Sequence, residues 1–233
     1  MRVIYPTKAF LDAFYSLSNE YANTGDANTV IVLGSHLFVE QFESINAFKK
    51  AYNINHMIVY NLEQLSNHCK WLTNKYTYLL KHADEVWDYD EANIEFLNNN
   101  NIRNNVNLHL LSPRSKHFVG CNIDYHPIDV FFYGSLNARR KKIIDELKSH
   151  KLNVEIGNGL YGDELTPMLC MSKVLLNIHY YPEALQEQAR LIRWMCMPNK
   201  IISERSRVNY LHINECNYDD IVERVLSMVK SIR

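Results

Sequence analysis

Short, largely apolar runs alternate with amphipathic segments along the first half of the chain. The runs have the length of β-strands and lie at residues 2–6, 29–34, 56–61, 85–89 and 106–111. Segments with the apolar spacing of helices lie between them, at 66–83 and 90–100. Nearly continuous apolar strands that alternate with helices are typical of a parallel sheet with helices on both faces.

The second half repeats this pattern after an irregular stretch. Residues 112–128 contain two prolines and a glycine and show no sustained period, which predicts a connecting segment. Predicted strands then lie at 129–134, 153–157, 174–180, 200–204 and 210–214, and predicted helices at 138–149, 163–172, 184–196 and 219–233. We therefore predict an α/β protein of two Rossmann-like, doubly wound parallel-sheet domains, residues 1–115 and 116–233, that face a central cleft.

The helix predicted at 138–149 begins with the cationic sequence ARRKK. The N-terminus of a helix carries partial positive charge and unpaired N–H groups, so cations are unfavourable there unless an anion lies nearby. A phosphate group is the simplest such anion. Gly134 lets the backbone approach a ligand, Ser135 offers its hydroxyl, and Arg139 or Arg140 can clamp the charge. The alternative is a solvated helix face whose cations pair with carboxylates one turn further on.

Composition adds limits rather than a function. Lys and Arg total 25 against 26 for Asp and Glu, so no overall positive field predicts binding to nucleic acid. The five cysteines are widely spaced and favour free thiols over a metal cluster. No apolar run reaches the ~18 residues of a membrane span. We therefore expect a cytoplasmic protein without stable membrane insertion, in the host cytoplasm if the chain is viral.

Four motifs of the second half together resemble the donor-binding domain of GT-B glycosyltransferases, in particular of short bacterial and viral members. In chain order they are the Gly134-Ser135 turn with its basic helix start, SKVLLNIHYY at 172–181, Glu187 with Arg190, and Ser203-Glu204. In the first half, MIVYNLEQL at 57–65 and the segment 79–97 resemble the acceptor-side domain of the same group. The resemblance covers most of the chain.

This resemblance implies a hexosyl- or pentosyltransferase that moves a sugar from a nucleotide sugar, of UDP or GDP type, to an acceptor hydroxyl. It implies no cofactor and no obligatory metal, because cationic side chains and helix N–H groups can stabilise the leaving diphosphate. The donor-binding residues expected from the resemblance and from the strand-end argument are Gly134, Ser135, Arg139, Arg140, His179, Tyr181, Glu187, Arg190 and Glu204.

One departure from the family concerns carboxylates. Many members carry a Glu-x7-Glu pair, but Met195 stands eight residues after Glu187. Either Glu187 or Glu204 would then contact the hydroxyls of the donor. The missing carboxylate also leaves an alternative function open, namely a catalytically inactive module that binds a nucleotide or a sugar phosphate.

Candidate catalytic residues follow two strands of the first half. Transfer with inversion needs a base that takes the proton of the acceptor hydroxyl, and His36 and Glu63 are the candidates for it. The sequence leaves inversion or retention open. Asp88 and Asp90 copy a metal-binding Asp-x-Asp motif. Because Asp90 is a good N-cap at the start of a helix, we expect this motif to be structural and expect no metal site.

The acceptor is open at this level. A saccharide or a lipid-linked molecule is the broader expectation, and hydroxymethylated DNA bases are the alternative in a phage setting. The net charge of −1 weighs against DNA, since duplex binding draws on several Lys or Arg contacts with phosphates.

Overall fold

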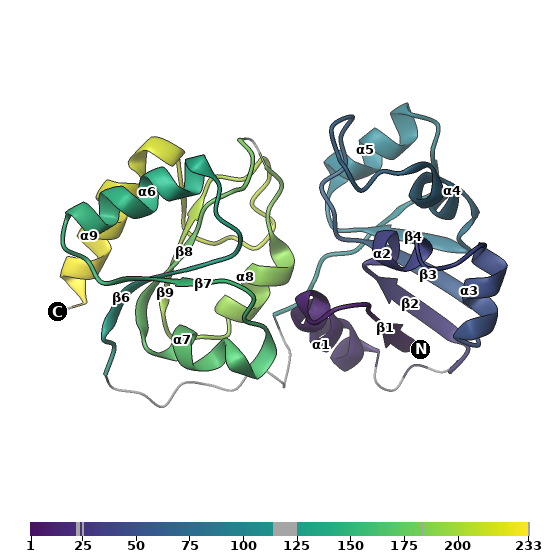
Figure 1. Cartoon of the computed structure of the whole chain (residues 1–233), viewed down its shortest axis with the longest axis horizontal. Helices are drawn as coiled ribbons and strands as arrows, with labels where there is room; N and C mark the ends of the chain where they lie inside the picture. The colour runs from purple at the N-terminus through teal and green to yellow at the C-terminus, as the bar shows by residue number, and fades with distance from the viewer. Residues whose placement is uncertain (22–23, 25, 114–124, 183, 233) are drawn as a thin grey trace. The chain divides into compact units, whose positions relative to one another are not determined.

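The computed structural model describes residues 1–21, 24, 26–113, 125–182 and 184–232. The chain divides into two compact units, Met1–His117 and Phe118–Arg233 (Figure 1). Each unit contains one five-stranded sheet in which neighbouring strands are parallel. The prediction of two parallel-sheet α/β domains is thereby confirmed. The predicted boundary between residues 115 and 116 lies outside the described residues.

The strands of the first unit follow chain order across the sheet. They are β1 (Arg2–Ile4), β2 (Thr29–Leu33), β3 (His56–Asn61), β4 (Glu85–Asp88) and β5 (Asn107–Leu108). The helices are η1 (Lys8–Phe10), α1 (Leu11–Glu20), α2 (Ser35–Val39), α3 (Ile45–Ala51), α4 (Asn74–His82) and α5 (Glu91–Asn99). Because this order contains no reversal, the predicted doubly wound order is absent from the described strands of this unit.

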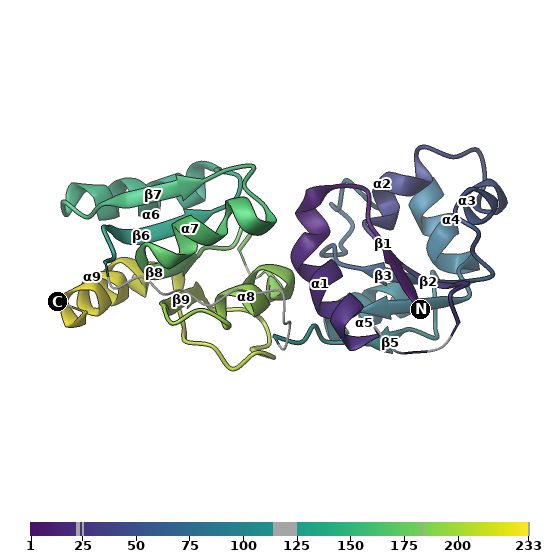
Figure 2. The same ribbon diagram turned by 90° about the horizontal axis from the view of Figure 1, so that it is seen from below.

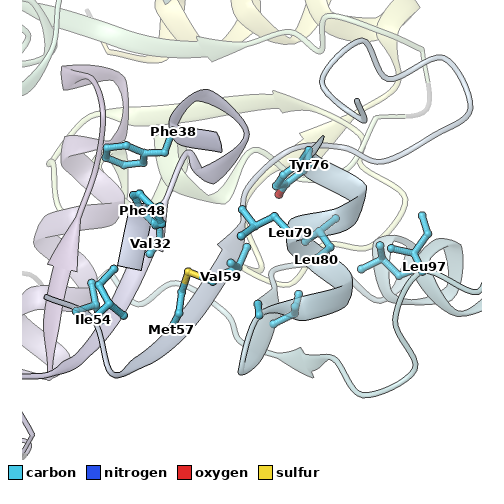
Figure 3. Packing of buried hydrophobic residues seen from close by; sticks show 14 of the residues in the cluster. Val32, Phe38, Phe48, Ile54, Met57, Val59, Tyr76, Leu79, Leu80 and Leu97 are labelled. Atoms are coloured by element: carbon cyan, nitrogen blue, oxygen red, sulfur yellow. The ribbon is translucent and has the colours of Figure 1, made fainter. Parts of the chain in front are cut away.

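Strands β2 and β3 are buried on both faces, and one face carries a large apolar cluster of the first unit. Val32 of β2 and Met57 and Val59 of β3 lie on the same side, as the two-residue period of a strand requires. Figure 3 shows their packing against apolar side chains of four helices, which are Phe38 of α2, Phe48 of α3, Tyr76, Leu79 and Leu80 of α4, and Leu97 of α5. This packing fixes β2 and β3, whose carboxyl ends lead into polar residues.

The second sheet has the strand order β10-β9-β8-β6-β7 (Figure 2). The chain adds β7 on one side of β6 and then β8, β9 and β10 on the other, so the order of strand addition reverses between β6 and β8. Its strands are β6 (Ile128–Tyr133), β7 (Val154–Gly157), β8 (Ser172–Asn177), β9 (Lys200–Glu204) and β10 (Glu215–Cys216). Its helices are α6 (Ala138–Ser149), η2 (Gly162–Glu164), α7 (Thr166–Cys170), α8 (Gln188–Trp194), η3 (Tyr218–Asp220) and α9 (Ile221–Ser231). The doubly wound prediction is confirmed for this unit.

Helices α6 and α9 lie side by side on one face of the second sheet, and α7 lies on the other (Figure 1). Val130 and Phe132 of β6 and Val174 and Leu176 of β8 form the core beneath α6 and α9. Where the strand order reverses, successive connections leave towards opposite faces of the sheet, so the carboxyl ends of β6 and β8 are the favoured place for a ligand.

Two elements near this edge differ from their prediction. The helix expected at 184–196 begins only at Gln188, since Glu187 has a ψ of 64° that is not helical. The strand expected at 210–214 is absent, and β10 follows it instead. Asn209 explains the loop, because its side chain accepts from Ile213 N (3.1 Å) and donates to Ile213 O (2.9 Å). Such local side-chain bonds compete with a strand for the backbone groups.

Two expectations from composition concern cysteines and membranes. Cys69, Cys196 and Cys216 are free thiols, whereas Cys170 is disulfide-bonded, so the expectation of free thiols is wrong for Cys170. Across the described ranges, no helix combines the length and the apolar character that a membrane span requires.

Candidate functional site

The basic start of α6 holds the chain where it leaves β8. The sheet pairing of β8 ends at Asn177, so the next three carbonyl groups need other hydrogen-bond donors. Three side chains from the start of α6 supply them. The bonds run from Arg140 Nε to Ile178 O (2.8 Å), from Arg139 Nη1 to His179 O (3.0 Å) and from Asn137 Nδ2 to Tyr180 O (2.7 Å). These contacts explain why Arg139 and Arg140 stand at this helix start.

Arg139 completes its contacts with Glu204 at the end of β9. Both Nη atoms of Arg139 bond to the Glu204 carboxylate, with Nη1 2.6 Å from Oε2. The same carboxylate accepts from His179 N at 3.0 Å, and the guanidinium lies 3.9 Å from the ring centre of Tyr218. Glu204 is only 5% exposed. The two residues therefore form a neutral, mostly buried pair that fixes the peptide groups of His179 on both sides.

Arg140 is also used internally. It is 2% exposed, and besides Ile178 O its guanidinium donates to Ser135 O (2.8 Å) and to Glu187 Oε1 (3.3 Å). Burial lowers the pKa of Arg140, while the nearby Glu187 carboxylate opposes that effect. Arg140 thus ties the Gly134-Ser135 turn to the end of β8 and places a buried positive charge beneath it.

Arg190 of α8 lies directly against Gly134. Its Nη1 donates to Asn177 Oδ1 and to Glu187 Oε2, both at 2.7 Å. Gly134 has a φ of +125°, and a Cβ atom on it would stand 3.0 Å from Arg190 Nη2. Only glycine fits there, for its backbone conformation and for the close approach. No acceptor for Arg190 Nη2 lies among the described residues, so this N–H₂ group has free donor capacity at the turn.

The charges of Arg140, Glu187 and Arg190 do not balance. Arg140 and Arg190 both contact Glu187, so two guanidinium groups share one carboxylate and the three side chains carry a net charge of +1. Their position is the reversal point of the sheet, beside the N-terminus of α6. A helix N-terminus, a glycine turn and an excess guanidinium together favour an anionic ligand such as a phosphate.

The remaining predicted donor residues differ in accessibility. The side chain of His179 is fully buried, with Nε2 3.4 Å from Ser206 Oγ. Ser135 is exposed on the turn. Tyr180 and Tyr181 are 39% and 58% exposed, and their rings meet edge to face at 4.9 Å. Tyr181 is thus open to a ligand at this edge, whereas the His179 imidazole belongs to the core.

The two predicted catalytic residues of the first unit lie together. His36 Nε2 is 3.6 Å from Glu63 Oε1. The His36 side chain is 5% exposed, and its ring centre lies 5.0 Å from that of Trp71 and 5.7 Å from that of Tyr76. Burial lowers the pKa of His36 to about 4 and raises that of Glu63 to about 7. At neutral pH the imidazole is therefore uncharged, while Glu63 is close to its midpoint of ionisation.

A buried carboxylate supports the backbone at Glu63. Asp88 at the end of β4 is 0% exposed and accepts from Asn61 Nδ2 (2.7 Å) and Asn93 Nδ2 (2.9 Å). The same two amides each donate to Glu63 O at 2.9 Å. Burial raises the pKa of Asp88 to about 7. Asp88 therefore holds the loop that carries the Glu63 side chain.

Asp90, the second residue of the Asp-x-Asp motif, caps α5. Its Oδ1 accepts from Ala92 N at 2.8 Å, which confirms the structural interpretation of this residue. Within the described ranges, no three His, Cys, Asp or Glu side chains are grouped so that they could hold a metal ion.

Two residues of this arrangement were not predicted from the sequence. Asn177 orients Arg190 and also donates to Ser203 Oγ at 3.1 Å. Asn137 is the N-cap of α6, where its Oδ1 accepts from Arg140 N at 2.9 Å. Both carried a usable signal, since Asn177 is a polar residue at the end of an apolar strand and Asn is a favoured N-cap.

Comparison with known proteins places the chain near giant-virus sequences. No known protein-family profile matches it. Three uncharacterized proteins of Acanthamoeba polyphaga mimivirus are similar: one is 27% identical over 96% of this chain, a second 28% over 76% and a third 31% over 45%. The chain spans only 27%, 25% and 37% of the lengths of these relatives.

Among solved structures, a mutant of S. aureus TarM in complex with Fondaparinux, alpha-GlcNAc-glycerol and UDP is similar. The TM-score is 0.54 at 13% identity, over 94% of this chain and 52% of that chain. Sucrose-phosphate synthase from Thermosynechococcus elongatus gives a TM-score of 0.47 at 11% identity, over 96% of this chain and 69% of that chain. The likeness to TarM shows that this chain has the GT-B fold, as the sequence motifs predict.

Proposed function

We propose that this chain is a glycosyltransferase that uses a nucleotide sugar as donor. The observation that carries the proposal is the net positive set of Arg140, Glu187 and Arg190 beside Gly134, at the reversal point of a GT-B-type sheet. A nucleotide sugar leaves behind a diphosphate, whose growing negative charge must be stabilised during transfer. A preformed positive site at this edge supplies that stabilisation.

We infer that the phosphates meet the Gly134-Ser135 turn, the first N–H groups of α6 and the free N–H₂ group of Arg190. Arg140 contributes its charge beneath the turn, where its Nε and Nη1 bond to backbone carbonyls and its Nη2 contacts Glu187. Tyr181 is exposed at the same edge and is proposed to contact the donor. Because protein cations fill the electrostatic role, the proposed reaction is metal-independent, with a UDP- or GDP-type donor and no cofactor.

Three of the expected donor-binding residues are better explained as support. Arg139 and Glu204 saturate one another, and His179 is buried between the backbone contacts they make. We propose that these residues hold the strand end on which the site depends, and that Glu187 is the carboxylate closest to the bound donor. Between Glu187 and Glu204, which the sequence leaves open, we thus propose Glu187.

Glu63 is our proposed general base on the acceptor side. A base with a pKa near the working pH combines a useful fraction of the ionised form with a real affinity for the proton. The pKa of about 7 for Glu63 meets this condition, and the pKa of about 4 for His36 does not. We assign to His36 the role of a neutral neighbour that shapes the surroundings of Glu63.

For the acceptor we propose a saccharide or a lipid-linked saccharide. We propose that the protein is viral and acts in the cytoplasm of the host cell. The similarity to mimivirus proteins supports the viral setting. Hydroxymethylated DNA is the weaker choice because the chain as a whole carries a net charge of −1.

The test is turnover of nucleotide sugars by the full chain. UDP- and GDP-linked hexoses and pentoses are offered with pooled acceptors, and released nucleoside diphosphate is measured. We expect one donor to be consumed and Arg190→Ala to lower the rate by roughly 100-fold or more, the cost of losing one preorganised donor to developing charge. Arg224→Ala, at an exposed position of α9, is the matched control and should leave the rate unchanged. Donor binding without any release would instead support the inactive binding module.

A further inference from the structure

Glu187 stands between the two arginines that face the proposed phosphate position. Its Oε1 lies 3.3 Å from Arg140 Nη2 and its Oε2 lies 2.7 Å from Arg190 Nη1. A carboxylate that bridges two guanidinium groups makes the kind of contact that a phosphate makes with paired arginines. Glu187 is thus an anion already bound at the cationic site.

Each arginine also has a neutral hydrogen-bond acceptor besides Glu187. Arg140 is anchored at 2.8 Å by Ile178 O and at 2.8 Å by Ser135 O. Arg190 is anchored at 2.7 Å by Asn177 Oδ1. All three acceptors are neutral. If the Glu187 carboxylate moved away, both guanidinium groups would still be held by the backbone or by Asn177.

Glu187 also differs from these anchors in exposure. Its side chain is 29% exposed, whereas Asn177 is 0% exposed. It lies just before α8, with backbone angles outside the helical region and no side-chain bond to the helix N-terminus. Glu187 is therefore the charged and accessible partner in a set whose other partners are fixed.

We propose that Glu187 is an exchangeable counter-anion, which the diphosphate of the donor replaces at Arg140 and Arg190. The inference rests on the proposed function and assigns to Glu187 control over donor affinity. In the empty site the carboxylate offsets the repulsion between the two arginines. When the diphosphate binds, it takes over these contacts, and when the product leaves, the returning carboxylate favours its release.

Two roles for Glu187 predict opposite results. A carboxylate that orients the arginines would strengthen anion binding, so its removal would weaken that binding. A carboxylate that competes with the ligand would do the reverse. Glu187→Gln keeps the size and one acceptor oxygen but raises the net charge of the set from +1 to +2. If Glu187 had a purely structural role, Glu187→Gln would not increase the affinity for an anion.

The experiment is calorimetric titration of the full chain with inorganic pyrophosphate, which carries the charge of the donor without its base or sugar. We expect Glu187→Gln and Glu187→Ala to bind pyrophosphate roughly tenfold more tightly than the unchanged chain, the effect of one nearby charge at a partly exposed site. The salt dependence of binding should steepen in both. Glu155→Gln, at an exposed position of β7, removes the same charge and should change nothing.

Equal or weaker pyrophosphate binding by Glu187→Gln overturns the inference, as does an equal gain in Glu155→Gln. Adding Arg190→Ala to Glu187→Gln must abolish the gain, because the arginine is the group that the ligand reaches. Thermal melting shows that each variant is folded. If the chain turns over a nucleotide sugar but Glu187→Gln does not bind pyrophosphate more tightly, only this inference is refuted. If Glu187→Gln binds pyrophosphate more tightly but the chain turns over no nucleotide sugar, only the proposed reaction is refuted.

Discussion

Gly134 and Arg190 are in contact across the carboxyl ends of β6 and β8, and a Cβ atom at residue 134 would stand 3.0 Å from Arg190 Nη2. The contact connects two features that are far apart in the sequence, a glycine turn after one strand and a helix after another. It brings the free N–H₂ group of Arg190 to the turn where the phosphates are proposed to bind.

Gly134→Ala is expected to lose donor binding. The new methyl group would push the Arg190 guanidinium away from the turn, and the φ of +125° is strained for any residue with a Cβ. We expect a loss of roughly 1–3 kcal/mol of unfolding free energy from the backbone strain. Nucleotide affinity, measured by thermal shift with UDP and GDP, should fall at least tenfold, about 1.4 kcal/mol.

Gly159→Ala is the matched control for this variant. Gly159 also has a positive φ, +71°, but no atom lies within 4 Å of the Cβ position. It should lose a similar amount of stability while retaining nucleotide binding. If both alanine variants bound nucleotides equally weakly, strain alone would explain the loss and the Gly134–Arg190 contact would have no special role.

The Arg139–Glu204 pair is expected to stabilise the fold rather than bind the donor. Arg139→Gln leaves the carboxylate of Glu204 mostly buried with only one of its partners, His179 N. Removing one member of a buried pair costs about 3 kcal/mol or more. Urea denaturation should show this loss, and Arg139→Gln combined with Glu204→Gln should restore part of it. A stable Arg139→Gln variant with weakened nucleotide binding would reverse the assignment.

The sequence predicts the local half of this arrangement well and the long-range half poorly. The helix at 138–149 and the strands at 56–61 and 200–204 match the structure, because their apolar periods and caps are local signals. The unfavourable charge at the start of α6 indicates that an anion is near. For Arg139 that anion is the carboxylate of Glu204, which lies 65 residues further along the chain. A rule that looks for carboxylates one helical turn away cannot predict such a distant partner.

The strand order is the second limit. Alternating strands and helices are present in both halves of the sequence, but of the two sheets formed by the described residues only the second reverses its order. The alternation fixes the elements and the parallel pairing, whereas the neighbour of each strand depends on packing between distant segments. Asn177 illustrates the same point, because its polarity is visible in the sequence but its partner Arg190 becomes clear only from the folded chain.

Asp88 is expected to matter for the loop at Glu63 and not as a metal ligand. Asp88→Asn replaces one acceptor oxygen by an N–H₂ group that faces the donors of Asn61 or Asn93. Leaving a buried donor of this kind without its acceptor costs roughly 1–3 kcal/mol. We expect lower stability in urea denaturation and no effect of added Mg²⁺ or Mn²⁺ on the melting temperature of either form. Stabilisation of the unchanged chain by a divalent ion, absent in the variant, would show instead that Asp88 binds metal.

The raised pKa of Glu63 predicts how activity depends on pH. Burial raises its pKa from an ordinary 4.5 to about 7, so the ionised base forms as the pH rises through 7. The specificity constant kcat/KM should therefore increase between pH 6 and 8 and level off above, with an apparent midpoint near 7. Glu63→Gln should remove this dependence and lower activity by roughly 100- to 10,000-fold. His36 has a pKa of about 4 and stays neutral throughout this range.

The same pKa has the opposite consequence for stability. A carboxyl group whose folded pKa is raised binds its proton more tightly in the folded state, so its contribution is fully present below the unfolded pKa near 4.5 and is lost as pH rises through about 7. Glu63→Gln should accordingly be more stable than the unchanged chain at pH 8.5 and not at pH 4, in thermal melts at both values. An activity profile that Glu63→Gln leaves unaltered, together with no such crossover in stability, would show that another group takes the proton and that Glu63 is ionised in the fold at neutral pH.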